Sequence, residues 1–393
     1  MKFREAGRLH SVREYYFSRK LAQLREFAAE GRPIINLGIG SPDLAPDSKV
    51  ISALTETAMD EANHGYQSYR GLPELRQAMS DFYQRTYGVS LDSGNQVLPL
   101  IGSKEGIMHL SMAFLEKGDE VLVPDPGYPA YSATAQLVGA SILKYDLRDE
   151  NDWQVQLDQL DKLRSDRTKL LWLNYPHMPT GATPDLEKLQ ALIEWAKEHS
   201  IILVNDNPYS LVGYENPFSI FQLIDEINNS DFEGIIELNS LSKSHNMAGW
   251  RLGMMLGDQN IIQSALKVKS NMDSGMFKGL QLAAVEALNL SNDFHQKRNS
   301  IYIKRRKIAE EMAAVLNCQV STKQGGLFLW MKIPDNYESA ELYSESILEK
   351  SDVFITPGFI FGKNGEGFLR ISLCTKSEQL LVALDRLKKA MEA

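Results

Sequence analysis

Short and almost continuous apolar runs recur along the first two thirds of the chain, and their length favours buried strands. These runs lie at residues 96–101, 121–124, 169–173, 201–206 and 234–238. Between them, helices are expected over 48–63, 107–115 and 184–199 and from Pro73 onward. Strand, loop and helix in repeated succession predict an α/β fold with a mainly parallel sheet covered by helices on both faces. Ligands bind beyond the carboxyl ends of such strands, so the site is expected in the loops there.

The pattern changes after about residue 285 and becomes typical of an α+β domain. A long charged helix is expected at about 290–316, then strands and a final helix. The strand-like runs lie at 326–331, 353–356 and 368–373. At the other end of the chain, a helix over 11–30 and a short strand over 34–37 are expected. We therefore predict a large domain of residues 46–285 and a smaller domain of residues 1–45 and 286–393.

Composition and charge exclude several classes of protein. The 393 residues are 43% hydrophobic and 24% charged, as in ordinary soluble globular proteins. The net charge of −9 comes without a lysine- and arginine-rich face, which disfavours a nucleic-acid partner. No run approaches the ~20 apolar residues that span a membrane. Cys318 and Cys374 lie in apolar surroundings without metal-ligand spacing, so we expect no metal site and a cytoplasmic protein with reduced cysteines. The N-terminal sequence Met-Lys-Phe-Arg-Glu leads into charged, aromatic-rich sequence, so we expect no signal peptide.

The stretch from Ser240 to Gly253 concentrates reactive groups in a short, glycine-punctuated segment. Lys243 follows two serines, and Arg251 comes eight residues later. A lysine that is desolvated or near positive charge can lose its proton and attack a carbonyl carbon. An arginine can bind a phosphate through two hydrogen bonds. A solvent-exposed loop lysine is the simpler interpretation of the segment on its own.

Other strand ends carry matching chemistry. The turn Gly102-Ser103-Lys104 leads from an apolar run into a helix, and such a turn presents free N–H groups to an anion. It lacks the spacing of a Walker loop. Asp206 ends another run, with Tyr209 three residues later. Asp206 could alternatively be a helix cap. Tyr66 lies in an aromatic loop and could either pack on the surface or reach into a site.

Together with Pro-Thr-Gly at 179–181 and Arg370 in Phe-Leu-Arg-Ile-Ser, these motifs resemble the class I/II aminotransferases of the fold type I pyridoxal-phosphate enzymes. The resemblance covers nearly the whole chain. It implies a sheet of the seven-stranded type, pyridoxal 5′-phosphate as cofactor, and a homodimer with shared active sites. It also implies amino transfer between an L-amino acid and a 2-oxo acid, expected to be 2-oxoglutarate. The segments 66–76, 100–107 and 267–275 are similar to the LL-diaminopimelate aminotransferase branch.

The resemblance assigns roles to individual residues. Lys243 resembles the Schiff-base lysine that also moves the substrate proton, Asp206 the partner of the pyridine nitrogen, and Tyr209 the phenol that binds the ring oxygen. Tyr128 resembles the aromatic side chain that stacks on the ring, although it could also be a plain core residue. The remaining cofactor residues implied are Gly102, Ser103, Lys104, Ser240, Ser242 and Arg251, with Tyr66 reaching the phosphate of a neighbouring subunit. The substrate residues implied are Arg370, which would bind the α-carboxylate, Gly40 and Asn174.

One position departs from the family pattern. The family has Asn-Pro-Thr-Gly where this chain has Met178 before Pro179, with His177 preceding it. A thioether cannot donate the hydrogen bond that the asparagine gives to the ring oxygen. That bond is therefore absent unless His177 or a water replaces it.

Two other classes of function stay open from the sequence. A carbon–sulfur β-lyase would use the same lysine, aspartate and arginine but would eliminate a substituent without a keto-acid acceptor. A cofactor-binding regulator without enzymatic activity would normally carry an added DNA-binding segment, and the N-terminal ~45 residues are too short for one.

Overall fold

The computed structural model describes residues 3–11, 16–224, 232–321 and 323–392. Part of the helix expected over 11–30 falls on residues 12–15, which lie outside the described residues. The described part forms helix α1, Tyr16–Ala29.

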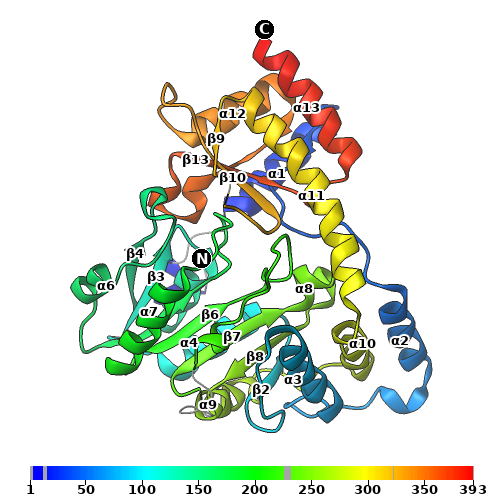
Figure 1. Cartoon of the computed structure of the whole chain (residues 1–393), viewed down its shortest axis with the longest axis vertical. Helices are drawn as coiled ribbons and strands as arrows, with labels where there is room; N and C mark the ends of the chain where they lie inside the picture. The colour runs from blue at the N-terminus through cyan, green and yellow to red at the C-terminus, as the bar shows by residue number, and fades with distance from the viewer. Residues whose placement is uncertain (1–2, 12–15, 225–231, 322, 393) are drawn as a thin grey trace.

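A seven-stranded sheet forms the base of the molecule (Figure 1) and confirms the mainly parallel sheet expected from the sequence. Its order is β2-β8-β7-β6-β5-β3-β4, and only β8 runs antiparallel to its neighbours. The strands are β2 (Val97–Leu100), β3 (Glu120–Asp125), β4 (Ser141–Asp146), β5 (Thr168–Leu173), β6 (Ile202–Asp206), β7 (Ile235–Ser240) and β8 (Gly253–Gly257). Neither β4 nor β8 was predicted, because β4 is a half-exposed edge strand and β8 is short and bounded by glycines.

Alternate residues of each strand enter different cores, which explains why the strands are apolar throughout. In β5, Leu171 and Leu173 join one core, whereas Leu170 and Trp172 join the other. The first core is covered by α3 (Pro73–Tyr87), α7 (Leu186–Glu198) and α10 (Lys278–Leu288). The second is covered by α4 (Ser103–Phe114), α5 (Pro129–Val138) and α9 (Gln259–Lys269). Both faces of the sheet are therefore shielded from water, as parallel sheets require.

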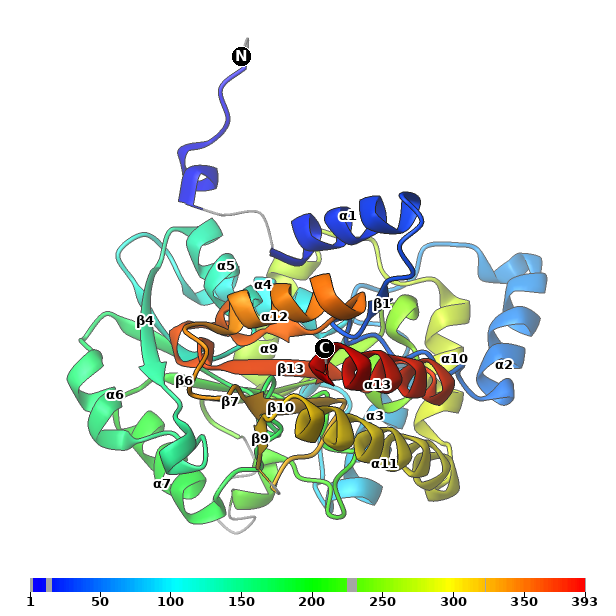
Figure 2. The same cartoon turned by 90° about the horizontal axis from the view of Figure 1, so that it is seen from above.

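A smaller sheet lies above the first (Figures 1 and 2) and is antiparallel, in the order β12-β13-β10-β9. Its strands are β9 (Gln319–Val320), β10 (Phe328–Lys332), β12 (Thr356–Pro357) and β13 (Phe368–Ser372). A separate parallel pair joins β1 (Ile35–Asn36) to β11 (Val353–Phe354), so the N-terminal segment is hydrogen-bonded to the C-terminal part of the chain. Helices α11 (Asn292–Val315), α12 (Ala340–Ser351) and α13 (Ser377–Glu392) accompany these strands.

The remaining helices are short or peripheral. They are α2 (Ser48–Met59), α6 (Leu157–Leu163), α8 (Leu241–Ser244) and the 3₁₀ turns Gly7–Ser11, Glu61–Asn63, Asp149–Asn151, Ile220–Leu223, Ala248–Trp250, Gly358–Phe361 and Lys363–Gly365. The helix expected from Ile107 begins earlier, at Ser103, so the glycine turn opens directly into its first turn. Figure 1 shows α11 running down from the small sheet toward α8.

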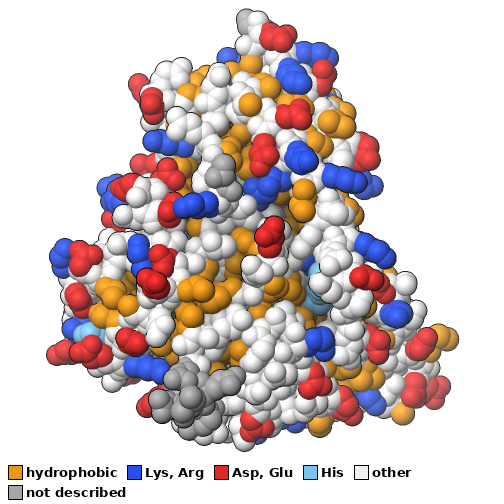
Figure 3. Space-filling model, viewed as in Figure 1, with side chains coloured by type: hydrophobic (Ala, Val, Ile, Leu, Met, Phe, Trp, Pro, Cys, Tyr) orange, Lys and Arg blue, Asp and Glu red, His pale blue; other side chains and the backbone are white. Residues whose placement is uncertain are grey.

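The surface carries charges of both signs. Figure 3 shows lysine and arginine side chains interspersed with aspartate and glutamate over the visible face. This face presents no continuous basic surface of the kind that binds nucleic acid. Among the described residues, no helix is both long and apolar enough to cross a bilayer.

The double-sided core predicts the cost of truncating a central side chain. Leu171 is fully buried, so Leu171→Ala should lower the free energy of unfolding by about 2–5 kcal/mol, through lost burial and the cavity it leaves. Leu186→Ala, at a position that is 51% exposed, is the matched control and should change it by less than about 0.5 kcal/mol. Urea unfolding of the two variants compares them directly, and equal costs would contradict the assignment of Leu171 to the core.

Candidate active site

A cavity of about 390 Å³ lies between the two sheets, at the carboxyl ends of β6 and β7. The large sheet and its loops contribute Lys243, Asp206 and Asn174 to its lining, whereas the small sheet contributes Arg370 and Phe328. Two parts of the chain that are distant in sequence therefore build one cavity. This is the position expected for a ligand of a parallel sheet.

Lys243 lies in the short helix α8, which begins where β7 ends. The Ser240 hydroxyl caps this helix by accepting a hydrogen bond from the Ser242 N–H. The Lys243 ammonium donates to the Gly40 carbonyl at 2.5 Å. Burial is the main cause that lowers the pKa of Lys243; Cys374 opposes it, and the guanidinium of Arg370 adds to it. A lowered pKa increases the fraction of the lysine that is present as the neutral, nucleophilic amine.

Asp206 ends β6 and is buried, with only one of its carboxylate oxygens bonded. The Tyr131 hydroxyl donates to Oδ2 at 2.9 Å, and Oδ1 has no partner among the described residues. Burial raises the pKa of Asp206 to about 7; the bond from Tyr131 opposes this shift, and the charge of Glu237 adds to it. A cationic N–H donor beside Oδ1 would remove the cost of burying this charge.

A tight turn at the start of α4 faces the same cavity. Gly102 has φ +79°, and a Cβ atom there would lie 2.1 Å from a guanidinium nitrogen of Arg251. A Cβ on Gly253 would lie 2.6 Å from the Ser103 backbone nitrogen. Both glycines therefore let Arg251 and β8 approach the turn closely. Ser103 and Lys104 line the cavity from the first turn of α4, where backbone N–H groups have no partner within the helix, and such a position suits an anion.

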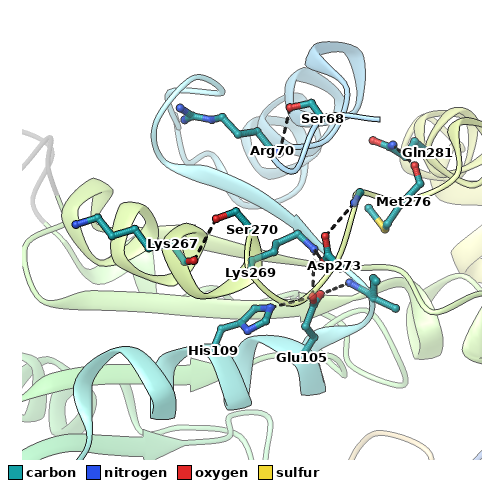
Figure 4. Close-up of polar contacts among 12 residues, drawn as sticks. Ser68, Arg70, Glu105, His109, Lys267, Lys269, Ser270, Asp273, Met276 and Gln281 are labelled. Atoms are coloured by element: carbon teal, nitrogen blue, oxygen red, sulfur yellow. Dashed lines mark hydrogen bonds and ion pairs between the residues drawn. The ribbon is translucent and has the colours of Figure 1, made fainter. Parts of the chain in front are cut away.

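A partly buried polar cluster fixes this turn from behind (Figure 4). Glu105 accepts from the Ile101 N–H at 2.5 Å and from the Lys269 ammonium at 3.1 Å, and lies 2.8 Å from a ring nitrogen of His109. Lys269 is also bound to Asp273. Burial would raise the pKa of Glu105, but the bonds from His109 and Lys269 prevail and lower it to about 2. Sequence reasoning missed this cluster, although Lys269 lies within the segment 267–275.

Arg370 projects from β13 between two aromatic rings. Its guanidinium carbon lies 4.0 Å from the ring centre of Phe328 and 4.5 Å from that of Phe361. One of its nitrogens donates to the Gly38 carbonyl at 2.9 Å, and the other lies 3.5 Å from the Met178 sulfur. The rings and the carbonyl orient the guanidinium toward the cavity before any ligand arrives.

The structure brings most of the predicted site residues together. Those that line the cavity are Gly40, Ser103, Lys104, Tyr128, Asn174, Asp206, Tyr209, Ser240, Ser242, Lys243, Arg251 and Arg370. Gly102 lies behind Arg251, and Tyr66 is 92% exposed and does not line this cavity in the single chain. Asn174 already bonds to backbone at both ends of its amide, to the Asp206 carbonyl at 2.5 Å and the Met178 N–H at 2.9 Å.

His177 does not stand in for the missing asparagine. Its Nδ1 lies 2.8 Å from the Thr180 hydroxyl, and the side chain is not among the residues that line the cavity. Burial lowers the pKa of His177 to about 3, so the ring is neutral. Met178 lines the cavity itself. The departure from the family pattern is therefore a thioether in the cavity wall.

Sequence reasoning missed Tyr131, Phe328 and Phe361, which complete the surroundings of Asp206 and Arg370. The only sequence signal for Tyr131 is its spacing of three residues from Tyr128, which places both at the start of α5. The rings of Tyr128 and Tyr131 pack edge to face at 5.6 Å.

These groups fit pyridoxal 5′-phosphate. The unpaired Oδ1 of Asp206 suits a protonated ring nitrogen, and the buried amine of Lys243 suits an aldehyde. The glycine turn with Arg251 suits a phosphate, since its glycines leave room that side chains would fill. Each of the three chemical features of the cofactor therefore has a matching group in one cavity.

Comparison with known proteins agrees with this fit. The chain matches the family described as aminotransferase class I and II over residues 32–387. It is 37% identical to the LL-diaminopimelate aminotransferase of Aquifex aeolicus over 388 residues, 98% of this chain and 99% of that protein. A substrate-bound structure of BacF from Bacillus subtilis superposes with a TM-score of 0.92 at 32% identity, covering 98% of each chain. An aspartate aminotransferase variant from Thermus thermophilus gives 0.90 at 26% identity, covering 99% of this chain and 100% of that one.

The chain shares its overall fold, built on the seven-stranded sheet, with these relatives, which are fold type I enzymes. Family match, near-full-length similarity and cavity chemistry agree, and this chain belongs to the class I and II aminotransferases, which makes it a pyridoxal-phosphate-dependent enzyme.

Proposed function

We propose that this enzyme transfers the amino group of an L-amino acid to 2-oxoglutarate, with a diaminopimelate-type amino acid as the first candidate donor. One observation carries the proposal: the Lys243 amine, the unpaired oxygen of Asp206 and the Arg370 guanidinium line a single cavity. The candidate donor comes from the relatives named LL-diaminopimelate aminotransferase, which match nearly the whole chain.

The cofactor residues divide the chemistry among them. When bound, pyridoxal 5′-phosphate supplies a carbonyl carbon that accepts the amino group and a ring that withdraws electrons from the substrate Cα. Lys243 would hold the cofactor and afterwards carry a proton to and from the substrate Cα. Asp206 would keep a proton on the ring nitrogen. Tyr209 would donate to the ring oxygen, and Tyr128 would pack on the ring face.

The phosphate would occupy the turn at the start of α4. The backbone and hydroxyl of Ser103 and the guanidinium of Arg251 supply the main donors, and the helix N-terminus adds its dipole. Gly102 gives Arg251 the room to reach this position. We assign Lys104, Ser240 and Ser242 to the same cup, although the Ser240 hydroxyl is also engaged as the cap of α8.

The substrate α-carboxylate would bind Arg370, which is already oriented by its two aromatic neighbours. Gly40 packs directly on Phe328, since a Cβ there would lie 2.4 Å from that ring, and its backbone would contact the substrate from this position. Asn174 would act on the substrate side by holding the loop that carries Met178. The amino group of the substrate is thereby directed toward Lys243.

We further propose a homodimer in which Tyr66 of each chain reaches the phosphate of the other. This role is supported by the 92% exposure of Tyr66 and by its absence from the lining of the cavity in its own chain. The two free cysteines support a cytoplasmic location. Residues 46–285 would be the cofactor-binding domain, and residues 1–45 with 286–393 the smaller domain that carries Arg370.

Reductive trapping tests the cofactor chemistry. Borohydride treatment of the protein loaded with pyridoxal phosphate should bleach its visible absorption and leave the cofactor mass on the peptide that contains Lys243. Lys243→Ala should show no such modification, whereas Lys104→Ala, which removes the other cavity lysine, should keep it on Lys243. A modification on Lys104 instead would contradict the assignment.

A panel of amino acids, tested for bleaching of the absorption band, then identifies the donor. Release of pyruvate without a keto-acid acceptor would indicate a lyase.

Arg370→Ala should weaken binding of the amino-acid substrate by about 10- to 100-fold, because a hydrogen bond to a charged group contributes about 1.5–3 kcal/mol. The amino-acid concentration that gives half the maximal bleaching rate measures this loss. Cofactor content is the control and should stay at the wild-type level. Loss of the cofactor in this variant would move Arg370 out of the substrate role.

The pKa of Asp206 predicts a pH-dependent stability of the cofactor-free enzyme. Between pH 4 and 7 the buried carboxyl keeps a proton that the unfolded chain releases, so stability falls as pH rises through this window. The fall amounts to about 1.4 kcal/mol for each unit of pKa shift. Asp206→Asn cannot titrate and should lack this component in urea unfolding at pH 5 and 8. Parallel stability curves for the two proteins would contradict the prediction.

A further inference from the structure

Arg298 is a buried arginine outside the cavity, in the second turn of α11. Only 2% of its surface is exposed. Its guanidinium donates to two backbone carbonyls of the large-sheet part, those of Ser244 and Leu211. It also donates to His295 Nδ1 at 2.9 Å and to the Asn299 side chain at 3.0 Å. One guanidinium therefore joins α11 to two separate loops.

Both loops carry groups of the active site. Ser244 directly follows Lys243 and ends α8, a helix of four residues. The last carbonyls of a helix have no partner within it, and so short a helix does not hold itself together. A cation at its C-terminus satisfies such a carbonyl and complements the helix dipole. Leu211 lies two residues after Tyr209, and Asn299 donates to the same carbonyl at 3.1 Å.

Burying the charge of Arg298 costs more free energy than a contact with only a structural role would require. Burial lowers the pKa of Arg298 to about 10, so the side chain is charged at neutral pH. Its charge is met by carbonyl and neutral side-chain acceptors rather than by a carboxylate among the described residues. Burial and the charge of Arg298 hold the pKa of His295 near 3, so His295 is a neutral acceptor. Burying a charge in this way is expensive, and an apolar side chain would fill the space at less cost.

We propose that Arg298 is a positioning residue, which fixes the backbone beside Lys243 and Tyr209 through the carbonyls of Ser244 and Leu211. The planar fork of an arginine can reach both carbonyls at once, and the single ammonium of a lysine cannot. Since α11 also packs on the small sheet, the same contact ties the two catalytic loops to the part of the chain that carries Arg370 (Figure 1). This inference rests on the proposed roles of Lys243 and Tyr209.

Two substitutions at Arg298 test the proposal in the full-length protein. Arg298→Met removes the charge and both hydrogen bonds to the carbonyls of Ser244 and Leu211. Arg298→Lys keeps the charge and can keep one of these two bonds. At saturating amino acid, Arg298→Met should slow the bleaching step by about 10- to 100-fold, because small misplacements of reacting groups have effects of this size. The half-saturating amino-acid concentration should change little, since Arg370 is untouched. Arg298→Lys should recover part of the rate.

Two further readouts do not depend on activity. The rate at which cofactor-free protein takes up pyridoxal phosphate reports how well Lys243 is presented, and the induced circular dichroism of the bound cofactor reports how it is held. Both should decrease in Arg298→Met and recover in part in Arg298→Lys. The matched control is Arg76→Met, since Arg76 also donates to two loop carbonyls, those of Ser93 and Gly94, away from the cavity. It should lower stability without changing either readout.

The outcomes separate this inference from the proposed function. If the wild-type enzyme shows no bleaching with any amino acid, the proposed function is wrong. If it bleaches and Arg298→Met matches its rate, cofactor uptake and dichroism within about 2-fold, the positioning role is wrong. If Arg298→Met does not accumulate as folded protein, Arg298→Lys decides the question. Wild-type rate, cofactor uptake and dichroism in Arg298→Lys would show that the two carbonyl bonds are not both needed, and would overturn the proposal.

Discussion

The half-bonded carboxylate of Asp206 is the interaction on which the active site depends most. The protein buries this carboxyl group, binds one oxygen through Tyr131 and leaves the other without a partner. Such an arrangement destabilises the cofactor-free protein and becomes favourable only when a positive group meets the free oxygen. In the role proposed for Asp206, the energy withheld from folding would be available for binding the cofactor and for keeping its ring nitrogen protonated. The electron-withdrawing power of the ring follows from that proton.

The topology of the large sheet explains why the other groups gather around Asp206. Parallel strands end on the same side, so the loops after β5, β6 and β7 deliver Asn174, Asp206 and Lys243 to one place. The single antiparallel strand, β8, returns the chain so that Arg251 faces the turn before α4. The small sheet then closes the cavity with Arg370. Burial of both faces of the sheet holds these strand ends in register.

The sequence predicted those parts of the site that depend on local chemistry. Glycine turns, strand-end polar residues and the lysine segment are visible in short stretches, and the structure gathers them as expected. Tyr131 was not predicted, because its bond to Asp206 joins residues 75 positions apart. The cluster of Glu105 and Lys269 spans 164 positions. Strand β4 lacked a signal because its exposed edge needs no continuous apolar run. Contacts of this kind are set by packing between elements, and no local pattern encodes them.

Met178, which departs from the family pattern, changes which groups orient Arg370 and which hydrogen-bond donors line the cavity. The thioether lies against Arg370 and leaves the arginine to be oriented by two aromatic rings and the Gly38 carbonyl. Among the neighbouring side chains, His177 is bonded to Thr180, and the amide of Asn174 is bonded at both ends. The His177 side chain does not line the cavity, and the two backbone bonds of Asn174 hold its amide in the loop that carries Met178. We assign the hydrogen bond that an asparagine would give to the ring oxygen to Tyr209 as a proposal, and the carbonyl of Leu211, two residues further on, accepts a hydrogen bond from Arg298.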